Sequence, residues 1–319
     1  MFRQLAVGLI ALCWLASGAG PVEAAEQPNA RALRAHALII GELKLLHQAD
    51  LVSFDPASVR VPHDDRQIRH VMQRARKLMG RVQKLRFMNG LPRNRAAPIE
   101  AKIIGTEDLA AMIEAILREV RELRPIYRIS NVKPPRDFAA DGTLKDIMQG
   151  LALADAMVEA LGVPAPVPND VYRTALSINA ALDRLLSARG LKPVEVKATE
   201  RNKVPTDVYA RVHEFLELLK RTVEEQPDFN IPGGITLPGR KTEPIKPKDV
   251  LDLLDDMLAD ILALKAAIGI RAPAEFTREQ VGKTPSDVFD QISRALFNLN
   301  RLRLQTRRQT KFGGTRNAE

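Results

Sequence analysis

The chain has 319 residues, enough for about two ordinary domains, and 45% of them are hydrophobic. Only 4% are aromatic, a composition that suits helices far better than β-sandwiches. The formal net charge of +9 favours acidic partners or surfaces, and the single cysteine excludes a disulfide framework.

Residues 1–24 are predicted to be a signal peptide. Arg3 provides the positive start, and an apolar stretch follows at 5–16. Small residues stand at the −3 and −1 positions of a cleavage site after Ala24. The stretch is shorter than the roughly 20 residues of a membrane span, and an uncleaved anchor is the alternative. Cleavage would remove Cys13, the only thiol, so a periplasmic or secreted protein without cysteine chemistry is expected.

Residues 25–163 are predicted to form a first unit of four helices, from the 3.6-residue periodicity of their apolar positions. The expected helices span 28–52, 63–88, 106–124 and 143–162. Most linkers are long and rich in proline and glycine, which cannot continue a helix. A linker of about 15 residues reaches about 50 Å, farther than the length of a 22-residue helix, about 33 Å. Consecutive helices could therefore be parallel as easily as antiparallel.

The second of these helices is unusually basic. From residue 66 to residue 86 it has no acidic residue, and its cations are Arg66, Arg69, Arg74, Arg76, Lys77, Arg81, Lys84 and Arg86. Since its apolar stripe occupies another face, the cations are expected on exposed faces, where they could attract anionic lipid, lipopolysaccharide or an acidic protein. Solvation, or pairing with the acidic helix at 247–269, is the more frequent outcome for such a charge run.

His63 and His70 are weak candidates for metal ligands. They are seven residues apart on one helix face, with Met72 and Met79 nearby, and copper or haem sites can use His and Met. The Glu-x-x-His pairs of di-iron bundles and the His-Glu-x-x-His motif are both absent from the sequence. No metal site and no cofactor is therefore expected.

Residues 164–310 are predicted to form a second four-helix unit after the short connection at 162–166. Its expected helices span 168–189, 205–226, 247–269 and 285–308, and a flexible basic tail follows at 311–319. Each unit is most simply a four-helix bundle, and a continuous helical solenoid is the competing arrangement.

The second unit repeats the landmarks of the first at a nearly constant distance. Pro168 follows Pro28 by 140 residues. Three aspartates that begin helices recur at offsets of 143, 141 and 141 residues. The sequence therefore predicts an all-α protein built by tandem duplication of the four-helix unit.

A Pro-x-Asp phrase, or its remnant, begins most of the helices. Its aspartates are Asp64, Asp108, Asp146, Asp170, Asp207, Asp249 and Asp287. Proline suits the first position of a helix, and an aspartate two residues later can accept hydrogen bonds from free backbone N–H groups. The phrase therefore predicts helix caps, and an acidic cation site is the alternative if several helix starts meet at one end.

The sequence contains no Gly-x-Ser-x-Gly, no Ser-x-x-Lys and no glycine-rich phosphate loop, so an enzyme is not expected. The expected function is that of a periplasmic interaction or scaffold protein that binds another protein of the cell envelope. The alternatives are a sensor module for a small ligand or metal, and a polyanion or membrane-surface binder. Nucleic acid is disfavoured because the chain is exported and has few aromatic residues for stacking on bases.

Overall fold

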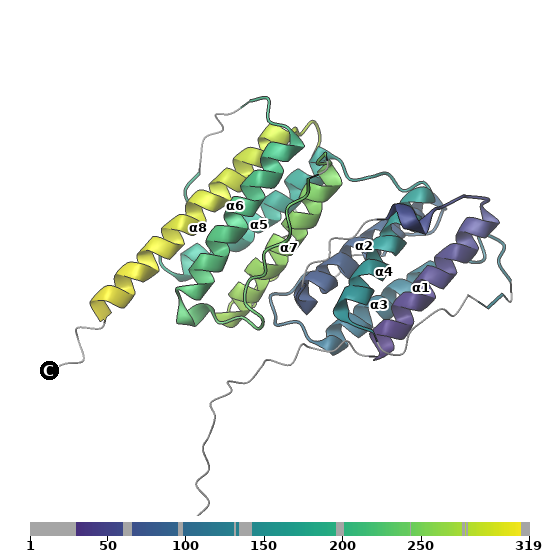
Figure 1. Cartoon of the computed structure of the whole chain (residues 1–319), viewed down its shortest axis with the longest axis horizontal. Helices are drawn as coiled ribbons and strands as arrows, with labels where there is room; N and C mark the ends of the chain where they lie inside the picture. The colour runs from purple at the N-terminus through teal and green to yellow at the C-terminus, as the bar shows by residue number, and fades with distance from the viewer. Residues whose placement is uncertain are drawn as a thin grey trace, which may run out of the picture.

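In the computed structural model the described residues are 30–59, 66–94, 98–130, 132–133, 142–195, 201–242, 244–275, 278 and 280–313. Within these ranges the chain forms eight α-helices, two short 3-10 helices and no strand (Figure 1). The all-α prediction is confirmed. The predicted signal peptide, together with His63 and Asp64, lies outside the described residues.

The helices follow the predicted order. They are α1 Ala30–Ala49, η1 Pro56–Ser58, α2 Ile68–Met88, α3 Thr106–Arg121, α4 Leu144–Ala160, α5 Pro168–Ala188, α6 Pro205–Glu224, η2 Pro227–Phe229, α7 Pro247–Ala267 and α8 Pro285–Gly313. The largest differences, of five residues each, are at the start of α2, predicted at residue 63, and at the end of α8, predicted at residue 308. Helix α8 continues to Gly313 because neither proline nor glycine interrupts it earlier.

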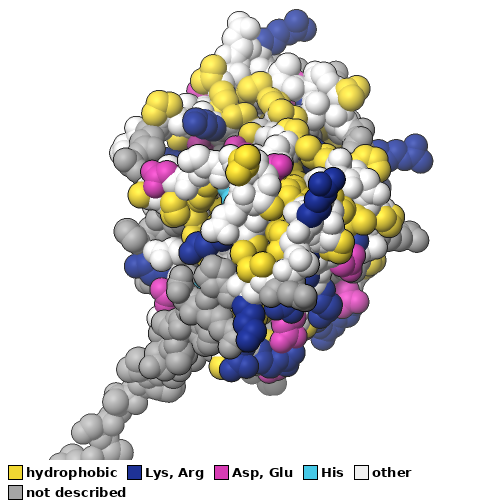
Figure 2. Space-filling model, turned by 90° about the vertical axis from the view of Figure 1, so that its right-hand side faces the viewer, with side chains coloured by type: hydrophobic (Ala, Val, Ile, Leu, Met, Phe, Trp, Pro, Cys, Tyr) yellow, Lys and Arg dark blue, Asp and Glu magenta, His cyan; other side chains and the backbone are white. Residues whose placement is uncertain are grey.

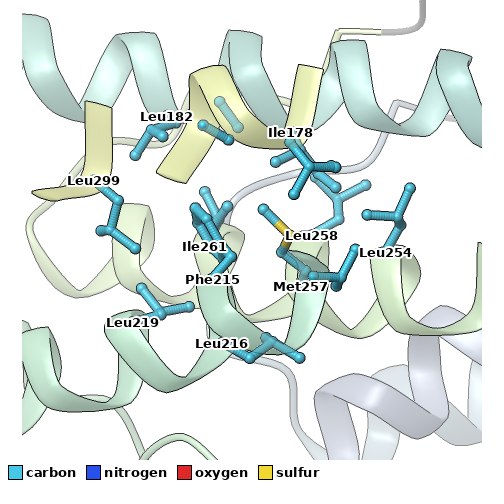
Figure 3. Close-up of a cluster of buried hydrophobic side chains, with 14 of the residues drawn as sticks. Ile178, Leu182, Phe215, Leu216, Leu219, Leu254, Met257, Leu258, Ile261 and Leu299 are labelled. Atoms are coloured by element: carbon cyan, nitrogen blue, oxygen red, sulfur yellow. The ribbon is translucent and has the colours of Figure 1, made fainter. Parts of the chain in front are cut away.

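The α-helices pack in two groups of four, α1–α4 around one apolar core and α5–α8 around another (Figure 1). In the first group α1 and α2 each contact α3 and α4, and in the second group α5 and α6 each contact α7 and α8. In the second core, Phe215 of α6 and Ile261 of α7 lie between Ile178 of α5 and Leu299 of α8 (Figure 3). Each such side chain contributes about 1.5–3 kcal/mol when it is fully buried.

The four helices of the second group run parallel. Near the starts of α6 and α8, the Lys203 backbone N–H donates to Ser286 Oγ at 3.0 Å. Near the other end of the same two helices, Arg303 forms an ion pair with Glu225 at 2.7 Å. Lys241 ties α7 to α6 at their starts, because its Nζ lies 2.7 Å from Asp249 and its backbone N–H donates to the Tyr209 hydroxyl.

The helices of the first group also run parallel. Arg31, near the start of α1, pairs with Glu107, near the start of α3, at 2.9 Å. Farther along the same helices Arg124 pairs with Glu42 at 2.6 Å. The α1–α4 contact has the same direction, since His47 Nε2 meets the Met157 carbonyl at 2.9 Å near the ends of both helices.

Parallel helices require each linker to return along the group. The linker between α5 and α6 does so beside α8, where the Lys192 carbonyl accepts from Arg301 at 2.7 Å and the Val194 N–H donates to Asn298 at 3.0 Å. These bonds satisfy backbone groups of the linker that no sheet or helix would otherwise pair. The long proline-rich linkers are therefore return segments.

The two groups meet through α2 and α7, which run in opposite directions. Arg69 of α2 pairs with Asp260 of α7, whereas Lys77, two turns later on α2, pairs with Asp252, two turns earlier on α7. Linker residues add to this contact, because the Ala274 N–H donates to the Ile99 carbonyl at 2.7 Å and Ala101 is buried in the second core. None of the described helices is long and apolar enough to span a bilayer.

Candidate functional site

Six of the eight cations predicted on the basic helix turn toward acidic groups of the same chain. The ion pairs are Arg66–Asp256 at 2.7 Å, Arg69–Asp260 at 2.6 Å, Arg74–Asp252 at 2.6 Å, Lys77–Asp252 at 2.5 Å and Arg81–Asp155 at 2.7 Å, together with Arg86 to Glu119 and Glu122. Four of these cations face α7, so this surface is called the α2–α7 interface. Of the other two cations in the set, Arg76 is half-buried and Lys84 is exposed. The eight residues therefore do not form one continuous exposed surface.

Arg69 is held on three sides at the α2–α7 interface. Besides Asp260, its guanidinium donates to the carbonyl of Pro232 at 2.9 Å and to the carbonyl of Gly234. Gly233 between them has a φ of +70°, and a Cβ there would collide with the Gln67 side chain. The linker after α6 is thus shaped around an arginine of the other group, a feature that the sequence analysis missed.

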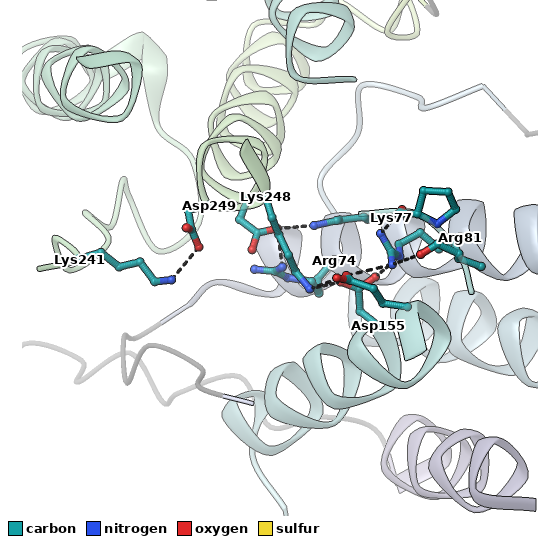
Figure 4. Close-up of polar contacts among 11 residues, drawn as sticks. Arg74, Lys77, Arg81, Asp155, Lys241, Lys248 and Asp249 are labelled. Atoms are coloured by element: carbon teal, nitrogen blue, oxygen red, sulfur yellow. Dashed lines mark hydrogen bonds and ion pairs between the residues drawn. The ribbon is translucent and has the colours of Figure 1, made fainter. Parts of the chain in front are cut away.

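Asp155 of α4 joins three elements at the edge of the interface (Figure 4). It pairs with Arg81 of α2 at 2.7 Å and with Lys248 of α7 at 3.0 Å. Glu159, one turn later on α4, lies 3.2 Å from Arg81. The cations of α2 are therefore neutralised by acidic residues of both groups, and only those of α7 were anticipated from the sequence.

The acidic residues of α7 have different proton affinities. Burial raises the pKa of Asp255 to about 7, and Asp252 adds to this effect while Lys77 opposes it. Burial also acts on Asp252, but Arg74 and Lys77 more than offset it and lower the pKa of that carboxyl. The interface therefore contains one carboxyl, Asp255, that titrates close to neutral pH, and burial raises the pKa of Asp256 as well. The pKa values of Asp252 and Asp260 are lowered instead, so these two carboxyls stay ionised.

His70, one of the two weak metal candidates, is buried at the same interface. Its Nε2 lies 2.9 Å from Asp260 Oδ1, so the ring already has a partner within the chain. Within the described ranges no three His, Cys, Asp or Glu side chains are grouped as metal ligands would be.

The aspartates that begin helices each bond to their own helix start. The carboxylate accepts from the backbone N–H three residues earlier at all six described positions, namely Asp108, Asp146, Asp170, Asp207, Asp249 and Asp287, at distances of 2.7 to 3.1 Å. These are the contacts of helix caps. The starts do meet at one end of each group, but every carboxylate points back to its own backbone.

The middle residue of Pro-x-Asp has a role that the sequence did not indicate. Asn169, at the start of α5, accepts from the Lys283 N–H before α8 at 2.8 Å. Ser286, at the start of α8, accepts in the same way from Lys203 before α6. At these two helix starts the variable position therefore ties one helix start to its neighbour.

A groove runs between α6 and α8 on the outside of the second group. Its residues are Arg211, Glu214, Glu217, Leu218, Arg221, Ser293, Leu296, Phe297 and Asn300, and it is called the α6–α8 groove. Phe297 is 49% exposed although it is a large apolar residue in a helix. This groove was not predicted from the sequence. A signal for it is that Phe297 and Leu304 are large apolar residues that do not fall on the apolar period of α8, and both are exposed.

Comparison of the chain with protein families, with characterised proteins and with solved structures found no match.

Proposed function

We propose that the chain is a non-enzymatic scaffold protein of the periplasm that binds another protein of the cell envelope through the α6–α8 groove. The observation that carries the proposal is the half-exposed ring of Phe297 in a groove with an apolar floor. Exposed aromatic side chains of this kind are the usual anchors of protein interfaces.

The chemistry of the groove favours an amphipathic helix as the partner. Leu218, Leu296 and Phe297 supply apolar contacts along the two helices. On the rim, Arg211 pairs with Glu214 at 2.8 Å, whereas Arg221 has no carboxylate partner among the described residues. A helix with an apolar stripe and an acidic residue beside it would fill the groove and neutralise Arg221.

The α2–α7 interface supports a scaffold role. Buried pairs such as Arg69–Asp260 hold the two groups in a fixed relative position, because separating them would leave unpaired charges in low dielectric. A protein of this kind presents surfaces at set distances from one another.

We further propose that the chain arose by duplication and that it is exported. The two groups descend from a tandem duplication of one four-helix unit, which is supported by the constant offsets in sequence and by the same pattern of neighbouring helices in both groups. The signal-peptide pattern of residues 1–24 supports export.

The test places a photo-crosslinking amino acid at Phe297 in the mature chain, exposed to periplasmic extract of the host. Val281, which is 84% exposed outside the groove, is the matched control position. The expected result is one dominant adduct at position 297 only. The purified partner should then bind the wild-type chain and the Val281→Ser variant, and should lose at least about tenfold in affinity for Phe297→Asp. A partner that binds Phe297→Asp as tightly as the wild type would overturn the proposal, as would a mature chain that retains no partner but turns over a substrate.

A further inference from the structure

The far end of the first group is an open surface. Since α1 to α4 run parallel, their C-terminal ends meet there, around the half-buried ring of Tyr127. Asn89, just after α2, donates to the Tyr127 hydroxyl at 3.5 Å, and Asp50, just after α1, helps burial to raise the pKa of that hydroxyl. A Cβ at Gly162, after α4, would lie 3.9 Å from the end of the Met88 side chain. This surface is called the open end.

Large apolar side chains protrude from the open end. Their exposed fractions are 92% for Leu51, 56% for Phe87, 50% for Met88, 38% for Ile126 and 47% for Val132. Val132 belongs to this end because its carbonyl accepts from Arg124 at 3.0 Å. Figure 2 looks at the side of the molecule where the first group lies, and exposed hydrophobic side chains are interspersed there with Lys and Arg.

The backbone at Leu51 holds its side chain outward. The residue has a φ of +55°, a left-handed conformation that costs a non-glycine residue energy. The turn is fixed by the Val52 N–H, which donates to the His47 carbonyl at 2.9 Å. A leucine in such a turn at nearly full exposure contributes little to the fold.

Exposed cations surround these apolar tips. Lys84, Arg93, Arg128 and Lys133 are all exposed, and Arg93 lies over the Phe87 ring at 4.5 Å from its centroid. Among the described acids at this end, Glu119 and Glu122 are occupied by Arg86, which leaves Asp50 and Asp55 as exposed carboxylates. Among the described residues the exposed charge around these side chains is therefore mainly positive.

Isolated exposed apolar side chains with cations between them are suited to binding a lipid surface. Protein partners bind in grooves and pockets such as the α6–α8 groove. Isolated exposed apolar side chains instead insert at the boundary between lipid headgroups and acyl chains, and the cations around them contact anionic headgroups. We propose that the open end binds the surface of a bilayer that contains anionic phospholipid. This inference goes beyond the proposed function, since it adds a membrane attachment at one end while the groove stays free for a protein.

The experiment measures sedimentation of the mature chain with phospholipid vesicles. The wild type should bind vesicles with anionic phospholipid better than purely zwitterionic ones, and raised salt should weaken the binding without abolishing it. The Leu51→Ser/Ile126→Ser variant should bind at least about tenfold more weakly. Neutralising the cations, with Lys84, Arg93, Arg128 and Lys133 all changed to Gln, should remove the preference for anionic vesicles.

Two controls keep the outcomes distinct. Val281→Ser removes an apolar side chain that is 84% exposed in a linker of the second group, and it should bind vesicles like the wild type. Phe297→Asp should also bind vesicles normally, so that failure of the groove proposal does not affect this one. Wild-type binding by the Leu51→Ser/Ile126→Ser variant would overturn the inference. So would a dimer of the wild type that this variant dissociates, because a second copy would then occupy the open end.

Discussion

The far ends of the two groups differ although their starts are alike. In the second group the linker after α6 folds over the end of the core, with Phe229, Ile231 and Ile235 all buried. At the open end of the first group, Leu51 and Ile126 face solvent instead. The second group therefore buries these linker residues in its own core. The first group packs Val52, Phe54 and Ile129 against its core but leaves Leu51 and Ile126 exposed.

Phe229→Ala should remove a buried linker side chain from the end of the second core, and it should lower the free energy of unfolding more than any other variant proposed here. The side chain is fully buried at the end of the core, so its loss should cost about 4 kcal/mol of unfolding free energy. Urea unfolding followed by circular dichroism measures it. If the free energy of unfolding falls by less than about 1 kcal/mol, the linker after α6 is not part of the second core, and the two ends do not differ in this way.

Asp260→Ala should weaken the contact between the two groups and lower the free energy of unfolding. Removal of this carboxylate leaves Arg69 and His70 buried without their partner, and should cost about 3 kcal/mol. The matched control is Glu107→Gln, which removes an exposed pair with Arg31 and should change stability by less than about 1 kcal/mol. Equal effects of the two variants would show that the α2–α7 interface adds nothing to the stability of the pair of groups.

The α2–α7 interface should also make stability depend on pH. The pKa of Asp255 is about 7 in the folded chain against an ordinary value of 3.8, so the folded state binds more protons between these values. Stability should therefore fall as pH rises from about 4 to about 7, and should level off above that. Asp255→Asn should flatten this slope in urea midpoints measured at pH 5, 6, 7 and 8. An unchanged slope would show that Asp255 does not titrate in this range.

Matched caps test whether the starts of the two groups are energetically alike. Asp146 and Asp287 accept from the backbone N–H of Thr143 and Thr284, both at 2.7 Å, and from the hydroxyls of the same threonines. Each aspartate-to-alanine change should cost about 1 kcal/mol in thermal or urea unfolding. A difference of more than about 1 kcal/mol between them would show that the two groups differ at their starts as well.

Leu51→Asn should have the smallest effect, and of the opposite sign. Asparagine tolerates the left-handed backbone better than leucine does, so stability should stay constant or rise by about 0.5 kcal/mol. A clear loss of stability would mean that Leu51 supports the fold, and the first group would then resemble the second at this end.

Helices and caps could be predicted because their causes are local. The proline and aspartate at the start of α5, Pro168 and Asp170, are two residues apart, and the carboxylate bonds to the backbone N–H of Val167. The apolar period likewise separates the core-facing side of each helix from the rest without any knowledge of its neighbours.

The sequence offered the acidic helix at 247–269 as one possible partner of α2, but it could not decide between that pairing and solvation. Arg69 and Asp260 are 191 residues apart, and periodicity marks Arg69 only as lying off the apolar stripe of its own helix. Whether that face meets solvent or another helix depends on how the two groups dock. The parallel order was open for a related reason, since a long linker permits either direction. Local sequence could not indicate the open end, because its tips come from separate elements.

The parallel arrangement also has a kinetic consequence. Consecutive helices in each group are joined by linkers that return over the helix length, so contacts between helices close long loops, and folding should be slow for the size of the chain. During synthesis the cations of α2 emerge long before Asp252 and Asp260 of α7, which neutralise them. The first group should thus complete its docking only after most of the chain has been made.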